Sequence, residues 1–488
     1  MSAVPNTSNK IVLVMPNDGF WTDLSNGVHL PGALLAIATL PDKDGFDVKI
    51  IDQRIDPQWK ENLVKELQDK PLFVGITSMT GSQITPALKI SAIVKENNCL
   101  CVWGGVHASL LPEQTLKNPL IDIIVKGEGE ITTLELAKAL RDKKSLLSVN
   151  GLYYKNKFND VVKTDDRDFV DLNELPDYPY HLINVKDYLY TFEGKKFLNV
   201  FSSRGCPFQC RFCYNTVFNK RLWRSIKAET VIKRIARLKK EFGIEGAWFR
   251  DDNFFVDIKN AEKIIKGLTE LGLCWGTSGA RLDLFARFDE DMIKTINKSN
   301  CKFLFMGIES GSNKILDLIG KQITREKIID VNKKILSRIN AVQRMNFMIG
   351  LPKETIQDLK DTISLSYQIL KDNKNAIISQ YQIYTPYPGT MLYTYSLENG
   401  FVEPRTLEEW SNYRFEVSNI PSIKQDHKNI LRMLAFTTWF MDDKIQIYSK
   451  SKMIKVLAKF YKPIARYRIK KLNASFPIDI KVAERIGF

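Results

Sequence analysis

Short apolar runs alternate with amphipathic stretches along the first third of the chain. The runs are rich in Val and Ile, end in Gly, Pro, Asp or Ser, and span residues 10–16, 46–52, 72–78, 99–105 and 121–127. Helical spacing of apolar residues is found at residues 31–40, 59–68, 84–97 and 132–143. This alternation predicts a doubly wound, Rossmann-like parallel sheet over residues 1–148. Ligands of such sheets bind beyond the carboxyl ends of the strands.

The same alternation returns after a different kind of stretch. Residues 149–194 combine a hairpin pattern with prolines and tyrosines, which indicates a linker. Residues 195–400 contain six strand–helix units, enough for a partial or complete TIM-like β/α barrel with its chemistry at the carboxyl ends of the strands. Residues 401–488 are basic and mainly helical in pattern. The predicted fold class is therefore α/β, with two domains followed by a helical C-terminal region.

Three of the seven cysteines, Cys206, Cys210 and Cys213, lie in one loop directly after the first strand of the second series. Cysteine thiolates bind zinc, copper(I) or iron–sulfur clusters. Structural zinc normally takes four ligands, but Cys274 and Cys301 lie inside predicted strands and no histidine is near the loop in sequence. Three thiolates with a vacant fourth position favour a 4Fe–4S cluster with one open iron. A zinc knuckle is the alternative.

The segment "CPFQCRFC" resembles the CxxxCxxC loop of the radical S-adenosylmethionine (SAM) enzymes, with Phe212 as the aromatic residue before the third cysteine. The resemblance continues in "FRDDNF", "SGARLD", "MGIESGS", "FMIGLP" and "TPYPGT". Upstream, "VWGGVHASLLPEQTL" and "IDIIVKGEGEITTLEL" are similar to the cobalamin-binding domain that precedes the barrel in some of these proteins. The resemblance, which is to class B radical SAM methyltransferases, covers roughly residues 10–400.

The resemblance implies a set of cofactor contacts in the barrel. Cys206, Cys210 and Cys213 would hold the 4Fe–4S cluster, and SAM would chelate its fourth iron. The implied SAM contacts are Phe212, Asp251, Asp252, Arg281, Glu309 and Gly350. These assignments have structural alternatives: the two aspartates could cap the following helix, Arg281 could pair with Asp283, and Gly350 could be a plain turn residue.

The implied cobalamin site lies at the strand ends of the first sheet. Its expected contacts are Ser78, Gly104, Gly105, Gly127, Glu128, Gly129 and Glu130. The DxHxxG motif that would supply a histidine to cobalt is not present, because Gly27 replaces the aspartate that would orient the imidazole. His29 is therefore not assigned as a ligand, and base-off binding is expected. His107 is interpreted as marking a loop turn.

The leading functional hypothesis is methylation of an unactivated carbon or phosphorus centre of a small-molecule or lipid substrate, with SAM, the cluster and cobalamin as cofactors. A radical cyclase or oxidoreductase, similar to the anaerobic porphyrin ring cyclases, is the alternative within enzymes. Methylthiotransfer is disfavoured because it needs three more N-terminal cysteines, and only Cys99 and Cys101 lie upstream of the loop. The resemblance also implies an electron donor such as flavodoxin or ferredoxin.

Charge adds one further expectation. The chain has 71 basic and 56 acidic residues, a formal charge of +15, and residues 449–471 contain no acidic residue. This segment, with its aromatic residues Phe460, Tyr461 and Tyr467, predicts a peripheral contact with anionic lipid or attraction of an anionic substrate, with a solvated helical face as the default. A non-catalytic, metal-containing nucleic-acid-binding protein is a different alternative, but the segment has no RNA-recognition signature, so no nucleic-acid partner is expected.

The expected location is the cytoplasm. The N-terminal sequence has no basic region followed by an apolar segment, which argues against a secretory signal. No apolar run reaches eighteen residues. Scattered cysteines in odd number do not suggest a disulfide framework.

Overall fold

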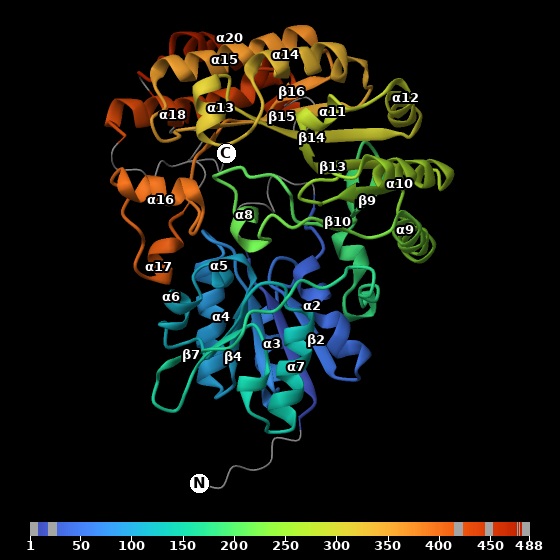
Figure 1. Ribbon diagram of the computed structural model, residues 1–488, viewed down its shortest axis with the longest axis vertical. Helices are drawn as coiled ribbons and strands as arrows, with labels where there is room; N and C mark the ends of the chain where they lie inside the picture. Colours follow the sequence, from blue (N-terminus) through green and yellow to red (C-terminus); the bar gives the residue numbers. More distant parts are fainter. Residues whose placement is uncertain are drawn as a thin grey trace.

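The computed structural model describes residues 8–17, 27–413, 423–444, 452–475, 477 and 479–480. Within these residues two α/β domains lie one above the other, and C-terminal helices cover the outer side of the second domain (Figure 1). The predicted fold class is confirmed.

A mostly parallel sheet forms the centre of the first domain. Its strand order is β2-β1-β3-β4-β5-β6-β7, with β1 to β5 parallel and β6 and β7 antiparallel. The strands are β1 (Lys10–Met15), β2 (Asp47–Asp52), β3 (Phe73–Thr77), β4 (Cys101–Gly104), β5 (Ile123–Val125), β6 (Leu152–Lys155) and β7 (Val161–Lys163). Every residue of β1 after Lys10 is buried, as expected for a parallel strand between two layers of helices. The predicted hairpin forms β6 and β7 and extends this sheet.

The helices of the first domain largely follow the predicted pattern. They are α2 (Gly32–Lys43), α3 (Trp59–Gln68), α4 (Ile84–Glu96), α5 (Gly105–Leu110), α6 (Pro112–Leu116) and α7 (Glu130–Arg141). The short helices α5 and α6 were not expected. They correct one interpretation: His107 does not mark a loop turn but lies inside α5, fully buried. Its backbone N–H donates to the carbonyl of Ser78, 3.1 Å away, so packing against β3 stabilises a helix too short to form alone.

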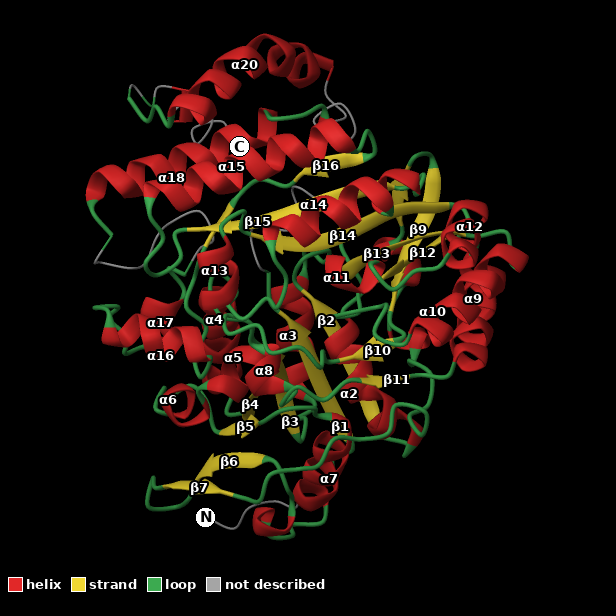
Figure 2. Ribbon diagram, turned by 45° about the horizontal axis from the view of Figure 1, so that its top comes forward, coloured by secondary structure: helices red, strands yellow, loops and turns green. Residues whose placement is uncertain are grey.

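The second domain is an open, curved half-barrel with helices on its outer side (Figure 2). Its strand order is β16-β15-β14-β13-β12-β9-β8, with β17 paired to β15, and all pairs are parallel except β8 with β9. The strands are β8 (Tyr190–Phe192), β9 (Lys195–Val200), β12 (Gly246–Phe249), β13 (Cys274–Arg281), β14 (Cys301–Glu309), β15 (Val342–Ile349), β16 (Ala376–Ile378) and β17 (Gln382–Ile383). The barrel is therefore partial.

Amphipathic helices cover this sheet. They are α9 (Ala228–Phe242), α10 (Ile258–Glu270), α11 (Leu282–Phe285), α12 (Glu290–Lys298), α13 (Asn313–Leu318), α14 (Arg325–Lys334) and α15 (Ile356–Asp372). Local sequence fixes their ends: Asp257 caps α10 by accepting from the N–H of Asn260, and Thr355 and Asp358 form a capping box on α15. A small ladder, β10 (Ser203–Arg204) with β11 (Arg224–Ser225), and helix α8 (Asn215–Phe218) flank the cysteine loop.

The C-terminal region joins the two domains. It contains α16 (Met391–Glu398), α17 (Leu407–Trp410), α18 (Gln425–Thr437) and α20 (Lys452–Lys471). Helices α16 and α17 descend from the second domain beside the first, at the left of Figure 1. There Trp410 is fully buried in the first domain's core, and its Nε1 donates to Oε1 of Gln114 at 2.6 Å. In the part of the chain that the structure describes, no helix has the length and apolar character needed to cross a bilayer.

Candidate active site

A cavity of about 1620 Å³ lies between the carboxyl edges of the two sheets. Met15, Thr77 and Gly104, the last residues of β1, β3 and β4, line one side. Phe201 and Arg250, which follow β9 and β12, line the other. Its volume exceeds the roughly 300–1,000 Å³ that is usual for a pocket holding one small ligand. The cavity therefore has room for more than one bound group.

The first-domain edge of the cavity is rich in glycine, as predicted. The cobalamin-contact candidates that line it are Gly104, Gly105, Gly127, Glu128, Gly129 and Glu130. Gly105 has a φ of +89°, and a Cβ there would lie 2.6 Å from the carbonyl oxygen of Ser78, so only glycine fits. Ser78 itself is fully buried behind this edge, where its Oγ donates to the carbonyl of Gly104 at 3.0 Å. It positions the edge and does not line the cavity.

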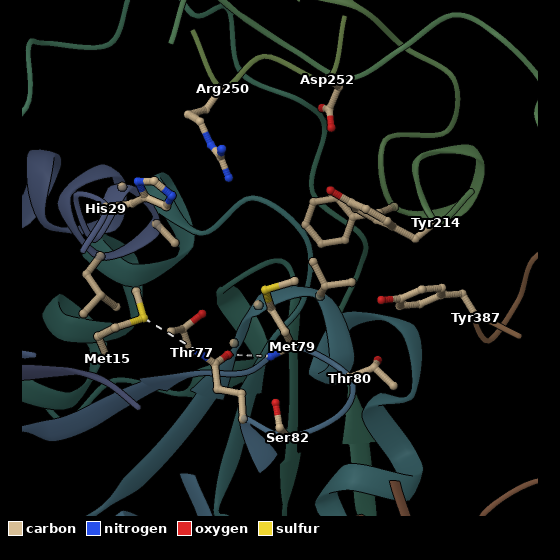
Figure 3. A pocket seen from close by; sticks show the side chains of 18 of the residues that line it. Met15, His29, Thr77, Met79, Thr80, Ser82, Tyr214, Arg250, Asp252 and Tyr387 are labelled. Atoms are coloured by element: carbon tan, nitrogen blue, oxygen red, sulfur yellow. Dashed lines mark hydrogen bonds between the residues drawn. The ribbon is translucent and has the colours of Figure 1, made fainter. Parts of the chain in front are cut away.

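Two side chains from the loop after β3, Met79 and Thr80, line the cavity beside this edge, and His107 of α5 is buried behind them. Met79, two residues after the end of β3, is 51% exposed, and its side chain points into the cavity together with that of Thr80 (Figure 3). Thr80 Oγ1 is 3.1 Å from Nδ1 of His107. Burial lowers the pKa of His107 to about 4, so its ring is neutral. An exposed methionine beside a glycine edge is suited to the flat face of a large ring.

Two acidic residues of the first domain connect this edge to the cysteine loop. Glu130, which begins α7, forms an ion pair with Arg204 of β10 at 2.6 Å. Glu128 receives two hydrogen bonds from Arg224 of β11, at 2.6 and 2.9 Å. The carboxylates predicted to contact cobalamin are therefore engaged with arginines of the second domain, and they hold the two domains together across the cavity.

The cysteine loop follows β9, as predicted, and its thiols are largely shielded. Cys210 is buried, and Cys206 and Cys213 are half-buried. Burial raises the pKa of Cys213 to about 12 and raises that of Cys206. Metal binding there must displace protons. Among the described residues no three His, Cys, Asp or Glu side chains converge to hold one metal ion. A cubane cluster does not require this, since each thiolate binds a different iron.

The two aspartates after β12 bind the cysteine loop and do not cap a helix. Asp251 accepts hydrogen bonds from the N–H and Oγ of Ser202 and from Oγ of Ser203. Burial nevertheless raises its pKa to about 6. Asp252 accepts from the N–H of Gly205 at 2.9 Å and from Nδ2 of Asn215 at 2.8 Å. The capping alternative is wrong, because Asp257 caps α10.

Arg281 makes the structural pair that was its alternative interpretation, and it also contacts the loop. Its Nε donates to Asp283 at 2.9 Å, and its Nη2 donates to the carbonyl of Lys321 at 2.6 Å. Its Nη1 lies 3.0 Å from Sγ of Cys210, and its guanidinium stacks over Phe208 at 3.9 Å. Arg281 therefore places a positive charge directly beside one thiol of the loop.

The remaining SAM-contact candidates lie around the barrel mouth but do not line the cavity. Phe212 packs against the core of the second domain. Glu309 has a φ of +71° and forms an ion pair with Lys321 at 2.8 Å. Gly350 has a φ of +75°, and its N–H donates to Oε2 of Glu354 at 2.5 Å. Of the six candidates, Asp252 alone lines the cavity among the described residues.

Four further side chains that line the cavity had no role assigned from the sequence, and Figure 3 shows them around it: His29, Tyr214, Arg250 and Tyr387. Tyr214 directly follows Cys213, and the charge of Asp252 raises its pKa. Tyr387, in "TPYPGT", lies with its ring 6.2 Å from that of Tyr214. Burial and the charges of Arg250 and Arg54 lower the pKa of His29 to about 3. A sequence signal was available for three of them, because Tyr214 directly follows the cysteine motif and Arg250 and Tyr387 lie inside "FRDDNF" and "TPYPGT".

Comparison with known proteins agrees with this arrangement. Residues 200–366 match the Radical SAM superfamily, and residues 23–137 match the B12 binding domain. An uncharacterized methyltransferase of Pyrococcus horikoshii is 32% identical over 454 residues, which is 90% of this chain and 94% of that one. This chain is a cobalamin-dependent radical SAM enzyme.

The other similarities of this radical SAM enzyme are more distant. Cytidylyl-2-hydroxyethylphosphonate methyltransferase of Streptomyces wedmorensis is 25% identical, with 85% of this chain and 86% of that protein covered. An anaerobic magnesium-protoporphyrin IX monomethyl ester cyclase of Cereibacter sphaeroides is 27% identical, with 79% and 63% covered. The radical SAM methyltransferase TsrM of Kitasatospora setae shares the fold, with a TM-score of 0.69 at 14% identity and coverage of 95% of this chain and 99% of that one.

The family assigns three cofactors to the enzyme: a 4Fe–4S cluster, SAM and cobalamin. The described residues fit them. Four glycines, Gly104, Gly105, Gly127 and Gly129, line the first-domain side of the cavity and put no side chain into it, which suits a large ring there. Three thiols in one loop, with the Arg281 guanidinium beside one of them, suit a cluster at the second.

Proposed function

We propose that the enzyme methylates an unactivated carbon or phosphorus centre of a small molecule that enters the cavity between the domains. The observation that carries this proposal is the shared cavity, which has the glycine edge of the B12-binding domain on one side and Tyr214 and Asp252, beside the cysteine loop, on the other. When bound, the cluster and SAM supply one-electron cleavage of a carbon–sulfur bond, and cobalamin supplies a transferable methyl group. The chain's residues orient these groups and exclude water.

Individual roles follow from the contacts. Cys206, Cys210 and Cys213 hold the cluster. Asp251 and Asp252 fix the loop that presents these thiols. The Arg281 guanidinium holds Sγ of Cys210 in place by a hydrogen bond from its Nη1 at 3.0 Å.

The remaining contacts of the proposal concern the two organic cofactors. Phe212, Glu309 and Gly350 contribute to the SAM site at the barrel mouth. Cobalamin would be held base-off by Gly104, Gly105 and the segment 127–130, which border the cavity. An electron donor such as flavodoxin or ferredoxin supplies the reducing electron, and the enzyme works in the cytoplasm.

A radical cyclisation or oxidation is the second candidate function, favoured by the similarity to the magnesium-protoporphyrin cyclase. The two functions differ in what is consumed. A methyl transfer of this kind consumes one SAM as methyl donor and one as radical source, so S-adenosylhomocysteine and 5′-deoxyadenosine form together. A cyclisation forms deoxyadenosine alone.

The test is anaerobic reconstitution with iron, sulfide and cobalamin, followed by incubation with SAM and reduced flavodoxin and mass spectrometry of both nucleoside products. Both products are expected. Formation of deoxyadenosine without S-adenosylhomocysteine would argue against methylation and for radical cyclisation or oxidation. Cys213→Ala should abolish both products and the cluster absorbance. Cys274→Ala, a buried thiol at the start of β13, is the matched control and should retain them.

A further inference from the structure

Helix α20 has three distinct faces, and one of them is apolar and exposed. Met453, Val456, Leu457, Phe460, Ile464 and Tyr467 are between 52% and 76% exposed. At 100° per residue these six side chains fall within about 100° of arc. Scattered surface apolar residues are ordinary, but a continuous stripe along four turns of one helix is not.

The opposite side of α20 attaches it to the protein. Ala458, Ala465 and Ile469 are buried there. The ring of Tyr461 packs against that of Phe440 at 4.8 Å, and its hydroxyl contacts Asp479. Tyr461 is therefore part of the packed face, unlike Phe460 and Tyr467, with which the sequence had grouped it. The apolar stripe is left outside because the helix already has a different face for packing.

Basic side chains form the third face, directly beside the stripe. They are Lys452, Lys455, Lys459, Arg466 and Lys470, which occupy the adjacent arc of about 60°. The helix contains no Asp or Glu. Lys462, between the basic and packed faces, pairs with Asp443 at 2.7 Å. Of the basic segment 449–471, residues 449–451 lie outside the described residues.

We propose that α20 lies in the surface of an anionic lipid bilayer, with the stripe among the acyl chains and the basic face against the headgroups. An interfacial helix requires an apolar face with aromatic and aliphatic side chains beside a lysine-rich polar face, and α20 presents both. Each lysine or arginine near an anionic surface adds attraction that salt weakens. The charge selects lipid over a second copy of the chain, since two copies of this face would repel each other.

The position of α20 is compatible with attachment during catalysis. It is the outermost helix of the second domain, on the side of α15 and α18 that faces away from the first domain (Figure 2). The cavity between the domains is lined by α18 residues such as Lys428 but, within the described part of the chain, by no residue of α20. Binding to a membrane therefore leaves the cavity walls in place.

The test is co-sedimentation of the full chain with vesicles of phosphatidylcholine alone and of an equimolar mixture with phosphatidylglycerol. Binding is expected to the mixed vesicles only and should weaken with salt. The double variant Leu457→Ser and Phe460→Ser should reduce the partition constant for mixed vesicles at least about tenfold, which corresponds to about 1.4 kcal/mol. Lys459→Gln with Lys470→Gln should weaken binding to the anionic vesicles.

The matched control is Leu147→Ser with Phe158→Ser, two side chains of the first domain that are 66% and 72% exposed. This control should bind as the unaltered chain does. Far-UV circular dichroism verifies that each variant is folded. Failure of the unaltered chain to bind mixed vesicles, or binding that survives the α20 substitutions, would overturn the proposal. Light scattering that shows a dimer lost in the Leu457/Phe460 variant would assign the stripe to a second copy. None of these outcomes depends on methylation.

Discussion

The glycine before the first cysteine gives the sharpest test of how the loop is held. Gly205 has a φ of +81°, and a Cβ there would lie 1.9 Å from the carbonyl oxygen of Leu222. Its N–H donates to Asp252 at 2.9 Å. Substitution by alanine therefore forces the two backbone segments apart by roughly an ångström or more, because non-bonded atoms need about 3.5 Å.

Two costs add up for Gly205→Ala. The left-handed conformation costs a residue with a Cβ about 1–2 kcal/mol. Loss of a buried hydrogen bond to a carboxylate costs about 1.5–3 kcal/mol. The free energy of unfolding should therefore fall by roughly 3–5 kcal/mol. Gly194, in the turn between β8 and β9, is the matched control: its φ is +76°, but a Cβ there meets nothing within 4 Å. Gly194→Ala should lower the free energy of unfolding only by the cost of the left-handed conformation, about 1–2 kcal/mol.

The assay is iron and acid-labile sulfide per chain after anaerobic reconstitution, with urea unfolding of the same samples. Gly205→Ala should lose most of its cluster, because displacement of residue 205 moves the adjacent Cys206. Gly194→Ala should load normally. If both variants load the cluster equally and unfold at the same urea concentration, the close approach to Leu222 does not position the loop, and the reasoning fails.

Three further predictions concern charged side chains. Burial raises the pKa of Glu354 from 4.5 to about 8. A raised carboxyl pKa stabilises the fold at low pH, and this contribution of up to about 5 kcal/mol disappears between about pH 4.5 and 8. Urea unfolding across that range should therefore depend less on pH in Glu354→Gln, and equal slopes would contradict this. Arg281→Lys cannot reproduce the forked contacts, so it should lower the free energy of unfolding by about 2–3 kcal/mol and reduce the iron content. The control, Arg287→Lys at an exposed position, should change neither quantity. Unchanged iron in both variants would argue against a role for the guanidinium. Glu130→Gln leaves Arg204 with only its longer ion pair to Glu128, at 3.4 Å, and should cost about 1–3 kcal/mol. It should also speed proteolysis between the domains; an unaltered digestion pattern would show that the Glu130–Arg204 pair does not hold the domains together.

The sequence predicted what depends on local pattern. Buried parallel strands need apolar runs, and helices over a sheet need one apolar face, so the alternation along residues 10–141 and 196–378 was readable directly. The cysteine loop was equally clear, because its spacing is local. The helix at His107 was missed, since α5 is too short to have a periodicity and depends on a contact with β3.

The candidate site was harder to predict where it depends on tertiary contacts. The spacing of Asp251 and Asp252 after a strand suits a cap as well as a loop anchor, and only folding brings Ser202 and Gly205 to them. Tyr387 and Tyr214 lie far apart in sequence and meet in one cavity. The buried Trp410 shows the same limit: an aromatic residue in a basic, helical region gave no sign that it enters the core of the other domain.

The cavity has a third wall, formed by Gln425, Lys428, Asn429 and Arg432 of α18. The strand ends that line the cavity belong to the two sheets, whereas this wall belongs to a segment outside both. Substitutions in α18 can therefore change which molecules enter the cavity without altering the residues at the strand ends. Exchange of this helix between related enzymes should therefore change which substrates they accept while the reaction stays the same.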